Sequence, residues 1–542
     1  MKKFLPLFLV VILGTFLRFW QIDKTPPSLY WDEVSQGYNA YSVLGTGRDE
    51  HNEFLPVAVF KAFGDYKAPV YIYLDVPFIA LFGKTTLGVR FPSALLGSLT
   101  ILFTYFLISE LFYDDKNKSK LALWGAFLLS ISPWHIQLSR AAYEGNAATF
   151  FTVLGIYLFF LAKRAKPKFY VLSIISFVFG FYAFNAHRVF IPLLVLLLAI
   201  IYFKDLLKEK KIIIVSVVAG LILLLPFIIY LRTPESKLRF NEVNIFSDLD
   251  VIKQSNRLIA QDNNSIIAKV LDNRRVLYSL SYVQHYFDFF NPTYLFFTGD
   301  VNPRFSLRDN GELFLWELPF LLTGAYLLIS QKSKTSLFIV GWFLLAPVAG
   351  AVARETPHAL RSETFIPSYE IIASLGIVFL IDLLKKINKQ IKSLLIVIFA
   401  GVIISSVYLF LHDYFVHFPV NFSYDWQYGY KEAVLETEKL KANYDYVAFT
   451  QSYGRPYIYV AFYSDITPQD FVKEAEFKVD PFGFYSVPKL GKYVFRSQLI
   501  DPSDVGKKVL YVGKPDQIPS TFTVIKRINF LNGDGAFVIA HS

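Results

Sequence analysis

The stretch FLPLFLVVILGTFLRFW (residues 4–20), followed after a short polar segment by YWDEVSQGYNAY (30–41), decides the fold. The first part is an apolar run of the length that crosses a lipid bilayer. The second part places two adjacent carboxylates, Asp32 and Glu33, among aromatic residues directly beyond that run. Ionisable groups close to a membrane are costly and are usually functional. The stretch therefore predicts a membrane-anchored protein with chemistry at the membrane surface.

Ten further apolar runs make the chain a mainly α-helical, polytopic membrane protein. Hydrophobic residues make up 54% of the 542 residues and charged residues only 18%, a balance that is rare in soluble proteins of this length. We expect about eleven transmembrane helices, at 4–22, 86–112, 119–134, 146–163, 169–185, 188–203, 211–231, 313–330, 336–353, 366–384 and 391–411. Residues 70–83 are also apolar but contain Asp75 and Pro77, which favours an interfacial or re-entrant helix.

The distribution of basic residues predicts the orientation. Alternate short connections, together with the N-terminus, carry nineteen Lys and Arg residues, whereas the connections between them carry four, namely Arg140, Arg188, Arg354 and Arg361. Basic loops remain on the cytoplasmic side. We therefore expect an integral, multi-pass protein of the plasma (inner) membrane with a cytoplasmic N-terminus. The asymmetry also accounts for the net charge of +10 without nucleic acid as a partner.

Three long segments are then predicted on the outer side, at 23–85, at 232–312 and after residue 412. The last contains the strand-like runs YDYVAFT, KVLYVGK, FTVIKRINFL and GAFVIAHS, and the helix signal TPQDFVKEAEF. We predict two domains, a transmembrane domain at 1–412 and a small extracytoplasmic α/β domain at 413–542.

Ionisable residues collect at the outer ends of the predicted spans, where several of them can serve one site. For most of them a structural role stays open beside the functional one. RDEH at 48–51 is compatible with a solvated loop, and His187 with Arg188 is compatible with a helix cap or a lipid-headgroup contact. Arg140 and Glu144 have the i, i+4 spacing of an intrahelical ion pair. Asp32 and Glu33 have no cation at close sequence spacing, which favours a functional role for them.

Other catalytic motifs are missing from the sequence. It contains no Walker loop, no dinucleotide-binding glycine pattern and no HExxH zinc motif, and it has no cysteine. His51, His187, His285 and His358 are scattered, so no cofactor is firmly implied, although a divalent metal is compatible with the sequence.

The order of four segments resembles the N-terminal half of bacterial protein-mannosyltransferase-like enzymes. These segments are WDEVSQGYNAY, GDYKAPVYIYL, GVRFPSALLGSLTILFTYFL and SPWHIQLSRAAYEGNAATFFTVLGIYLFF. The family (glycosyltransferase family 39) belongs to the GT-C superfamily, which includes the lipid A aminoarabinose transferases. The resemblance covers about residues 1–410, and DWQYGYKEAV at 425–434 is similar to a segment near the end of such proteins.

The resemblance implies a glycosyltransferase that uses a polyprenyl-phosphate sugar as donor and a protein, lipid or glycan as acceptor. It assigns the catalytic base to Asp32, with Glu33 beside it. Lys67-Ala68-Pro69 is similar to the family's Lys-Pro-Pro segment, whose Lys lies near the lipid phosphate, and Arg140 corresponds to an arginine at the outer end of the third span. Glu144 stands where relatives often have Asp. The remaining candidates for donor or substrate binding are Asp65, Tyr66, His187, Arg188, Arg354, His358 and Arg361.

The chemistry of the implied reaction fits this set of residues. One carboxylate removes the proton of the acceptor hydroxyl during attack on C1. The leaving phosphate is stable as an anion and needs cations rather than a second acid. We therefore expect an inverting single displacement of a mannose-like hexose on the outer side. The alternative is a transporter or flippase of lipid-linked sugars, although such proteins commonly show internal repeats and charges at the midplane. An inactive scaffold is a third possibility, against which the retention of Asp32, Lys67 and Arg140 argues.

Overall fold

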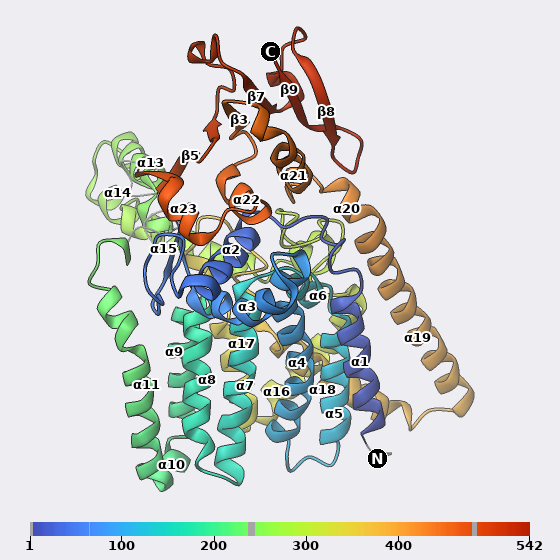
Figure 1. Ribbon diagram of the computed structural model, residues 1–542. Helices are drawn as coiled ribbons and strands as arrows, with labels where there is room; N and C mark the ends of the chain where they lie inside the picture. Colours follow the sequence, from blue (N-terminus) through green and yellow to red (C-terminus); the bar gives the residue numbers. More distant parts are fainter. Residues whose placement is uncertain (1–3, 64, 237–243, 480–484) are drawn as a thin grey trace. The chain divides into compact units, whose positions relative to one another are not determined.

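The computed structural model describes residues 4–63, 65–236, 244–479 and 485–542 (Figure 1). The chain forms two compact units. Unit 1 comprises residues 1–17, 96–138 and 144–408. Unit 2 comprises residues 18–95, 139–143 and 409–542. Four of the described helices begin in one unit and end in the other, namely α1 (Leu5–Phe19), α4 (Thr86–Leu111), α6 (Pro133–Arg140) and α19 (Lys389–His412).

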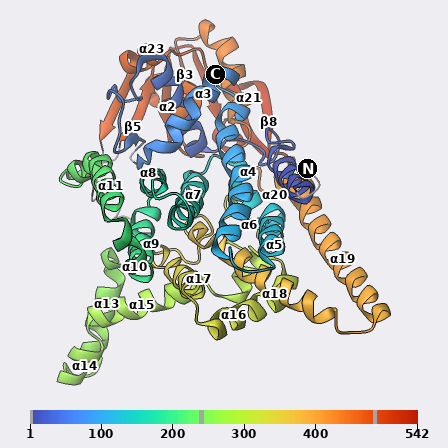
Figure 2. The ribbon, with the colours of Figure 1, turned by 90° about the horizontal axis from the view of Figure 1, so that it is seen from below.

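Unit 1 is a helical bundle. Figure 2 shows α5, α7 and α8 of this bundle close to end-on. Its helices are α5 (Lys118–Ile131), α6 (Pro133–Arg140), α7 (Glu144–Arg164), α8 (Phe169–Ala183), α9 (His187–Ile201), α10 (Phe203–Leu206), α11 (Lys210–Tyr230), α13 (Leu249–Gln261), α14 (Ile266–Leu271), α15 (Arg274–Asp288), α16 (Leu318–Gln331), α17 (Lys334–Leu345), α18 (Ser368–Leu384) and α19 (Lys389–His412). The prediction of a mainly helical membrane protein is confirmed, because each of the eleven apolar runs coincides with a helix.

Within the described residues, five helices are long and apolar enough to cross a membrane on their own. They span Thr86–Leu111, Glu144–Arg164, Phe203–Tyr230, Lys334–Val352 and Lys389–Asn421. A sixth span is formed if α5 and α6, which meet at a 58° bend, are taken together. The other predicted spans are shorter helices of 14 to 17 residues.

Unit 2 contains two helices of the first long loop, four helices of the C-terminal part and a seven-stranded sheet. The helices are α2 (Trp31–Thr46), α3 (Pro69–Phe82), α20 (Phe418–Asn421), α21 (Tyr430–Leu440), α22 (Pro456–Tyr463) and α23 (Pro468–Glu474). The sheet strands are β3 (Tyr446–Thr450), β4 (Ala475–Val479), β5 (Tyr485–Leu490), β6 (Tyr493–Arg496), β7 (Val509–Gly513), β8 (Thr523–Asn529) and β9 (Gly535–His541).

The strand order is β4-β5-β6-β3-β7-β9-β8, with β3 parallel to both β6 and β7 and the other pairs antiparallel. A separate hairpin pairs β1 (Phe60–Ala62) with β2 (Asp65–Lys67). The predicted α/β fold of the C-terminal part is confirmed, and the four strand-like runs form β3, β7, β8 and β9. Three short strands, β4, β5 and β6, were not predicted from the sequence. The helix signal TPQDFVKEAEF gives α23 only as far as Glu474, and its last residues begin β4.

Candidate active site

The acid pair lies in the first turn of α2, a helix with well-defined ends. Asp32 and Glu33 are acidic residues at a helix N-terminus, where the helix dipole favours negative charge. The helix ends at Gly47, whose φ of 69° suits a residue without Cβ. Within α2, a Cβ atom on Gly37 would lie 2.5 Å from Val89 and 2.9 Å from Phe462. Gly37 therefore allows α2 to approach both neighbours closely, and this contact fixes the position of its first turn.

Glu33 is fully buried and its carboxylate is saturated with hydrogen bonds. Arg90 donates to it twice, from Nε to Oε1 at 2.8 Å and from Nη2 to Oε2 at 2.9 Å. The backbone N–H groups of Tyr30 and Ala142 donate to it as well, at 3.2 and 2.9 Å. Four donors occupy the lone pairs of a carboxylate. Glu33 is therefore held as an internal anion without contact to solvent.

Asp32 has a different environment from its neighbour. Its side chain is 23% exposed, and its Oδ1 accepts a charge-assisted hydrogen bond from Nζ of Lys67. Lys67 is the last residue of β2, directly before Ala68 and Pro69, where α3 begins. Its ammonium group also lies 5.7 Å from the ring centre of Phe63. The hairpin β1–β2 thus delivers one cation to the accessible carboxylate.

Two buried arginines hold the loop that leads into α2. Arg90 spends its remaining donors on the carbonyl oxygens of Ile22, Pro26 and Ser28, at 3.0, 2.8 and 2.6 Å. Arg140 donates from Nη2 to the carbonyl oxygens of Trp20 and Thr25, each at 2.7 Å. Carbonyls of an irregular loop need partners when they are buried. The two guanidinium groups supply them, so the loop that leads to Asp32 is held at several points.

Arg90 is the main residue that the sequence analysis missed. It stands in the first turn of the apolar run 86–112, within GVRFP, and its side chain is fully buried. A lone arginine inside an apolar run is itself a signal of a specific partner. Arg140, in contrast, was expected at the lipid phosphate, and in this structure it is buried against the rings of Tyr414 and Phe415, at 5.4 and 4.9 Å.

The interpretation of residues 48–51 as a solvated loop holds for Arg48, which is exposed, but not for the three residues that follow it. Asp49 and Glu50 are buried, and the ring of His51 lies 4.8 Å from the rings of both Phe477 and Tyr485. Burial raises the pKa of Asp49 to about 6 and raises that of Glu50 well above its ordinary value. Burial, with a smaller effect of the Lys61 charge, lowers the pKa of His51 to about 4.

These shifts have opposite effects on stability. Between pH 6.5 and 4 the folded chain resists protonation of His51, so stability is lost as the pH falls through that range. Asp49 binds its proton more readily in the folded state, so its contribution increases as the pH falls through 6. Replacing His51 by Phe removes the loss of stability at low pH that His51 causes and leaves the contribution of Asp49 in place.

We therefore expect His51→Phe to become more stable relative to the native chain as the pH falls from 6.5 to 4. The gain is up to about 3 kcal/mol, because each pKa unit corresponds to about 1.4 kcal/mol. Melting temperatures of both proteins in detergent, measured across this pH range, provide the test. If the difference in melting temperature between the two proteins stays the same at all pH values, the assignment of His51 as a buried neutral imidazole is contradicted.

Five of the other predicted residues lie in unit 1, and their described contacts go to separate partners. Arg188 lies over Phe227 at 4.8 Å, and Nε of Arg354 donates to the carbonyl of Asn244 at 3.2 Å. Nδ1 of His358 lies 3.6 Å from Oδ2 of Asp300, and Arg361 donates to the carbonyl of Glu355 at 3.1 Å. His187 is buried beside Phe184 and Phe190.

For three further candidates, Glu144, Tyr66 and Asp65, the secondary structure shows where they lie. Glu144 begins α7 whereas Arg140 ends α6, so the interpretation of this pair as an intrahelical ion pair is wrong: residues 141–143 break the helix. Tyr66 is buried on β2 beside Lys67. For Asp65 only the backbone, in β2, is among the described features, and its side chain lies outside them.

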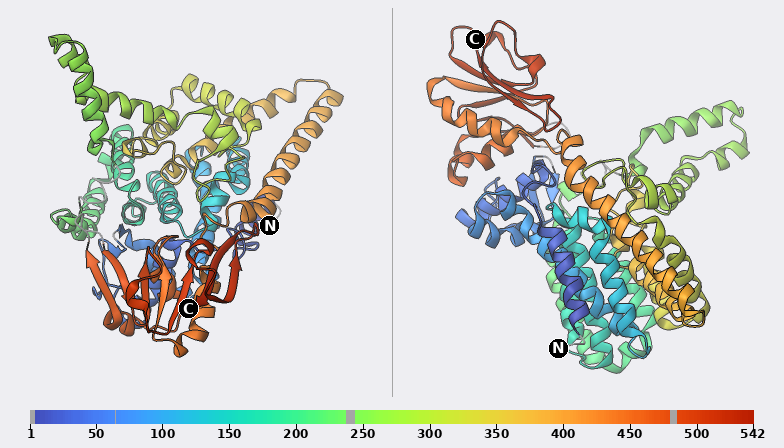
Figure 3. Two further views of the ribbon diagram at one scale, coloured as in Figure 1. Left: turned by 90° about the horizontal axis from the view of Figure 1, so that it is seen from above. Right: turned by 90° about the vertical axis from the view of Figure 1, so that its right-hand side faces the viewer.

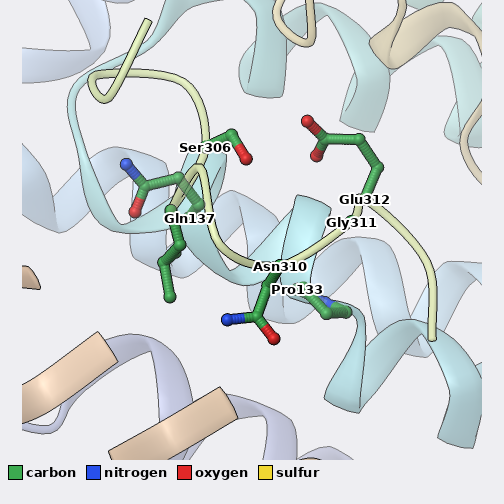
Figure 4. Close-up of a pocket in the computed structure, with 7 residues that line it drawn as sticks. Pro133, Gln137, Ser306, Asn310, Gly311 and Glu312 are labelled. Atoms are coloured by element: carbon green, nitrogen blue, oxygen red, sulfur yellow. The ribbon is translucent and has the colours of Figure 1, made fainter. Parts of the chain in front are cut away.

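A small pocket in unit 1 is lined by α6 and the loop that contains Glu312 (Figure 4). Its empty volume, part of which is open to solvent, is about 170 Å³, and its lining residues are Pro133, Gln137, Ser306, Leu307, Asn310, Gly311 and Glu312. Gln137 donates to the carbonyl of Arg304 at 2.9 Å, and Glu312 accepts from the N–H of Asp300 at 3.2 Å. The first of these bonds holds the loop on α6, and the second lies within the loop. Among the residues that the structure describes, no group of three or more His, Asp or Glu side chains is arranged for a metal ion.

Known proteins with a similar sequence segment or a similar fold are of two kinds, a sequence family and solved structures. Residues 66–230 match the sequence model of the dolichyl-phosphate-mannose-protein mannosyltransferase family. No curated protein sequence matches the chain. ArnT from Cupriavidus metallidurans bound to undecaprenyl phosphate is structurally similar, with a TM-score of 0.56, 11% identity and coverage of 99% of this chain and 97% of ArnT.

A second similar structure is the archaeal oligosaccharyltransferase AglB from Archaeoglobus fulgidus, in complex with an inhibitory peptide and a dolichol-phosphate. It has a TM-score of 0.53 and 16% identity and covers 85% of this chain. This chain spans only 64% of the length of AglB. Residues 66–230 are therefore similar to the mannosyltransferase family, and the chain shares its fold with these two structures.

Proposed function

We propose that the chain transfers a mannose-like hexose from a polyprenyl-phosphate sugar to a hydroxyl group of a protein, lipid or glycan acceptor. The observation that carries this proposal is the contrast between the two adjacent acids of α2. Asp32 is accessible and paired with Lys67, whereas Glu33 is buried and saturated by four donors. This arrangement supports a single catalytic base next to a single cation.

Asp32 is the general base of the proposed reaction. Its carboxylate takes the proton of the acceptor hydroxyl while the oxygen attacks C1 of the sugar. The bond between C1 and the phosphate oxygen breaks on the opposite side, and the polyprenyl phosphate leaves with the electron pair. One displacement inverts the configuration at C1. The phosphate needs no proton from a second acid, and the environment of Glu33 is consistent with this.

Lys67 is the cation that receives the leaving phosphate. In the absence of substrate its ammonium group binds Asp32 and neutralises the carboxylate. The phosphodiester of the donor, whose two non-bridging oxygens share one negative charge, competes for this ammonium group, and its binding then frees Asp32 to accept a proton. Donor binding and activation of the base are thereby coupled. Arg140, which is buried and bound to loop carbonyls, positions the loop before α2 in this proposal and does not bind the phosphate.

The similar proteins support a lipid-phosphate donor. ArnT is bound to undecaprenyl phosphate and AglB to dolichol-phosphate in the structures to which this chain is similar. The matched family is named for transfer from dolichyl-phosphate-mannose to protein. We propose the extracytoplasmic side as the place of reaction, because the basic connections predicted on the cytoplasmic side leave Asp32 and Lys67 on the other.

The test is a transfer assay with the purified chain in liposomes. Undecaprenyl-phosphate-linked mannose, glucose and galactose, each with a labelled sugar, are supplied with a cell-envelope fraction as acceptor. Label that leaves the lipid and appears in protein, lipid or glycan, together with release of undecaprenyl phosphate, supports the proposal. Movement of the labelled lipid across the bilayer without sugar transfer would instead identify a flippase and overturn the proposal.

Replacing Lys67 by Gln is expected to lower kcat/KM for the donor about a hundred- to a thousand-fold, because one preorganised charge at a developing anion is lost. The measurement is initial transfer rate against donor concentration. Lys61→Gln is the matched control, since Lys61 lies on the same hairpin and pairs with Glu53. Equal loss of activity in both variants would point to general damage of the hairpin and against a phosphate contact.

A further inference from the structure

The helices α13, α14 and α15 form a projection on unit 1 that the proposed reaction does not use. Ser255 on α13 donates to the carbonyl of Asp272 at 2.5 Å, and Tyr278 on α15 donates to the carbonyl of Asp248 at 2.7 Å. Figures 2 and 3 show this projection extending away from the bundle and across the direction of α7 and α8. It is therefore a defined element that lies crosswise to the spanning helices.

The face of α15 that meets the bundle is polar. Tyr282 and Tyr286 donate to the carbonyls of Val348 and Leu344, at 3.3 and 2.8 Å. Nδ1 of His285 lies 2.9 Å from the carbonyl oxygen of Ala353. These carbonyls belong to the end of α17 and the segment that follows it, and they are anchored by side chains of α15.

The opposite face of α15 is apolar and exposed. Val276, Leu280, Val283 and Phe287 follow the 4-3-4 spacing of a single helix face, and they are 37 to 63% exposed. On α14, Ile266, Ile267, Val270 and Leu271 are 61 to 82% exposed. We call these eight residues the apolar face. A helix on a water-covered surface shows the reverse pattern, with apolar residues inward, so water is an unfavourable neighbour for this face.

Two observations identify what covers the apolar face. It continues onto the lipid-facing surface of a spanning helix, because α15 binds the end of α17, where Leu344 is itself 51% exposed. Basic residues also border it: Lys269 on α14 and Arg274 and Arg275 at the start of α15 are exposed. An exposed apolar stripe with flanking Lys and Arg is the pattern of a helix that lies in the membrane interface.

We propose that α14 and α15 lie in the interfacial layer of the bilayer that α17 crosses, with the apolar face on the acyl chains and the basic residues at anionic headgroups. The contact between α15 and the segment after α17 also affects Arg354, one of the residues predicted to bind the donor or substrate. Ala353 pairs with Asn244 and is held by His285, and Arg354 follows it. A membrane-seated α15 thus fixes the position of the segment that carries Arg354.

The chain has no cysteine, which allows a direct test. Ile267→Cys and Leu280→Cys on the apolar face, and Gln254→Cys and Gln261→Cys on the exposed polar surface of α13, are each labelled with a solvent-sensitive fluorophore. The labelled proteins are reconstituted in phosphatidylglycerol-containing vesicles. We expect a blue shift of emission, and loss of emission in brominated-chain lipid, at positions 267 and 280 only.

Two outcomes would overturn the proposal. Equal water exposure at all four positions would show that the apolar face is free in solution. A blue shift without quenching by brominated chains, present only when two copies share a nanodisc, would show that a second copy of the chain covers the face. Melting temperatures equal to that of the unlabelled chain confirm that each variant is folded, so that a negative result counts against the proposal.

Discussion

Asp32→Asn is expected to lower the rate of sugar transfer by about a hundred- to ten-thousand-fold, the range that a general base contributes. Asn keeps the size of the side chain and can still accept a hydrogen bond from Lys67, but it cannot take a proton from the acceptor. The loss should therefore appear in kcat, with donor binding retained. Rates of label transfer and equilibrium binding of the labelled donor lipid, measured on the same preparation, separate the two effects.

Asp205→Asn is the matched control for this experiment. Asp205 is also paired with a lysine, Lys334 at 3.2 Å, and its side chain is 25% exposed, close to the 23% of Asp32. The control variant should transfer sugar at the native rate. Activity of Asp32→Asn within a few-fold of native would remove Asp32 from the role of base. Loss of donor binding in the same variant would instead assign Asp32 to the binding of the donor.

The helical part of the fold can be predicted from the sequence because its signal is local. An apolar run such as 391–411 is continuous along the chain, and it forms α19 without reference to any distant residue. The strands β5 and β6 lack such a signal. Their alternation is short and mixed, with Lys489 and Arg496 among the apolar residues, and they exist because β6 pairs with the distant β3. Pairing partners of this kind are not encoded within the strand itself.

The two acids of the candidate site can be predicted from the sequence, whereas the partners of its arginines cannot. The pair Asp32 and Glu33 stands out because two charges follow directly on a membrane span. The difference between the two acids comes from Arg90, which is 57 positions away along the chain from Glu33. Arg140 has a basic side chain at a span end, as expected, but its partners are loop carbonyls that carry no sequence signature. Sequence alone therefore indicates which groups are charged and leaves open which of them are already neutralised.

Removal of Arg90 is the second change with a large expected effect, and its effect is on folding. In Arg90→Met the carboxylate of Glu33 stays buried without its cation, and the carbonyls of Ile22, Pro26 and Ser28 lose their donor. Breaking a buried ion pair by removing one partner costs about 3–5 kcal/mol. We expect the free energy of unfolding to fall by at least this amount. Denaturant unfolding in detergent can follow it through tryptophan emission, because Arg90 lies 5.6 Å from the ring of Trp426.

The matched control is the pair Arg164 and Glu110, which has the same two-bond geometry, at 2.7 and 2.9 Å, on a more exposed surface. Because solvent screens such pairs, Arg164→Met should cost less than about 1 kcal/mol. A double variant, Arg90→Met with Glu33→Met, then separates charge from loop support. It removes both buried charges, so the part of the loss that comes from an unpaired anion should be recovered, whereas the part that comes from the three carbonyls should remain. Full recovery would show that the loop does not need Arg90, and no recovery would show that the ion pair contributes little. Partial recovery of stability, with transfer activity still reduced, is the result expected if Arg90 and Glu33 hold the loop in the position from which Asp32 acts.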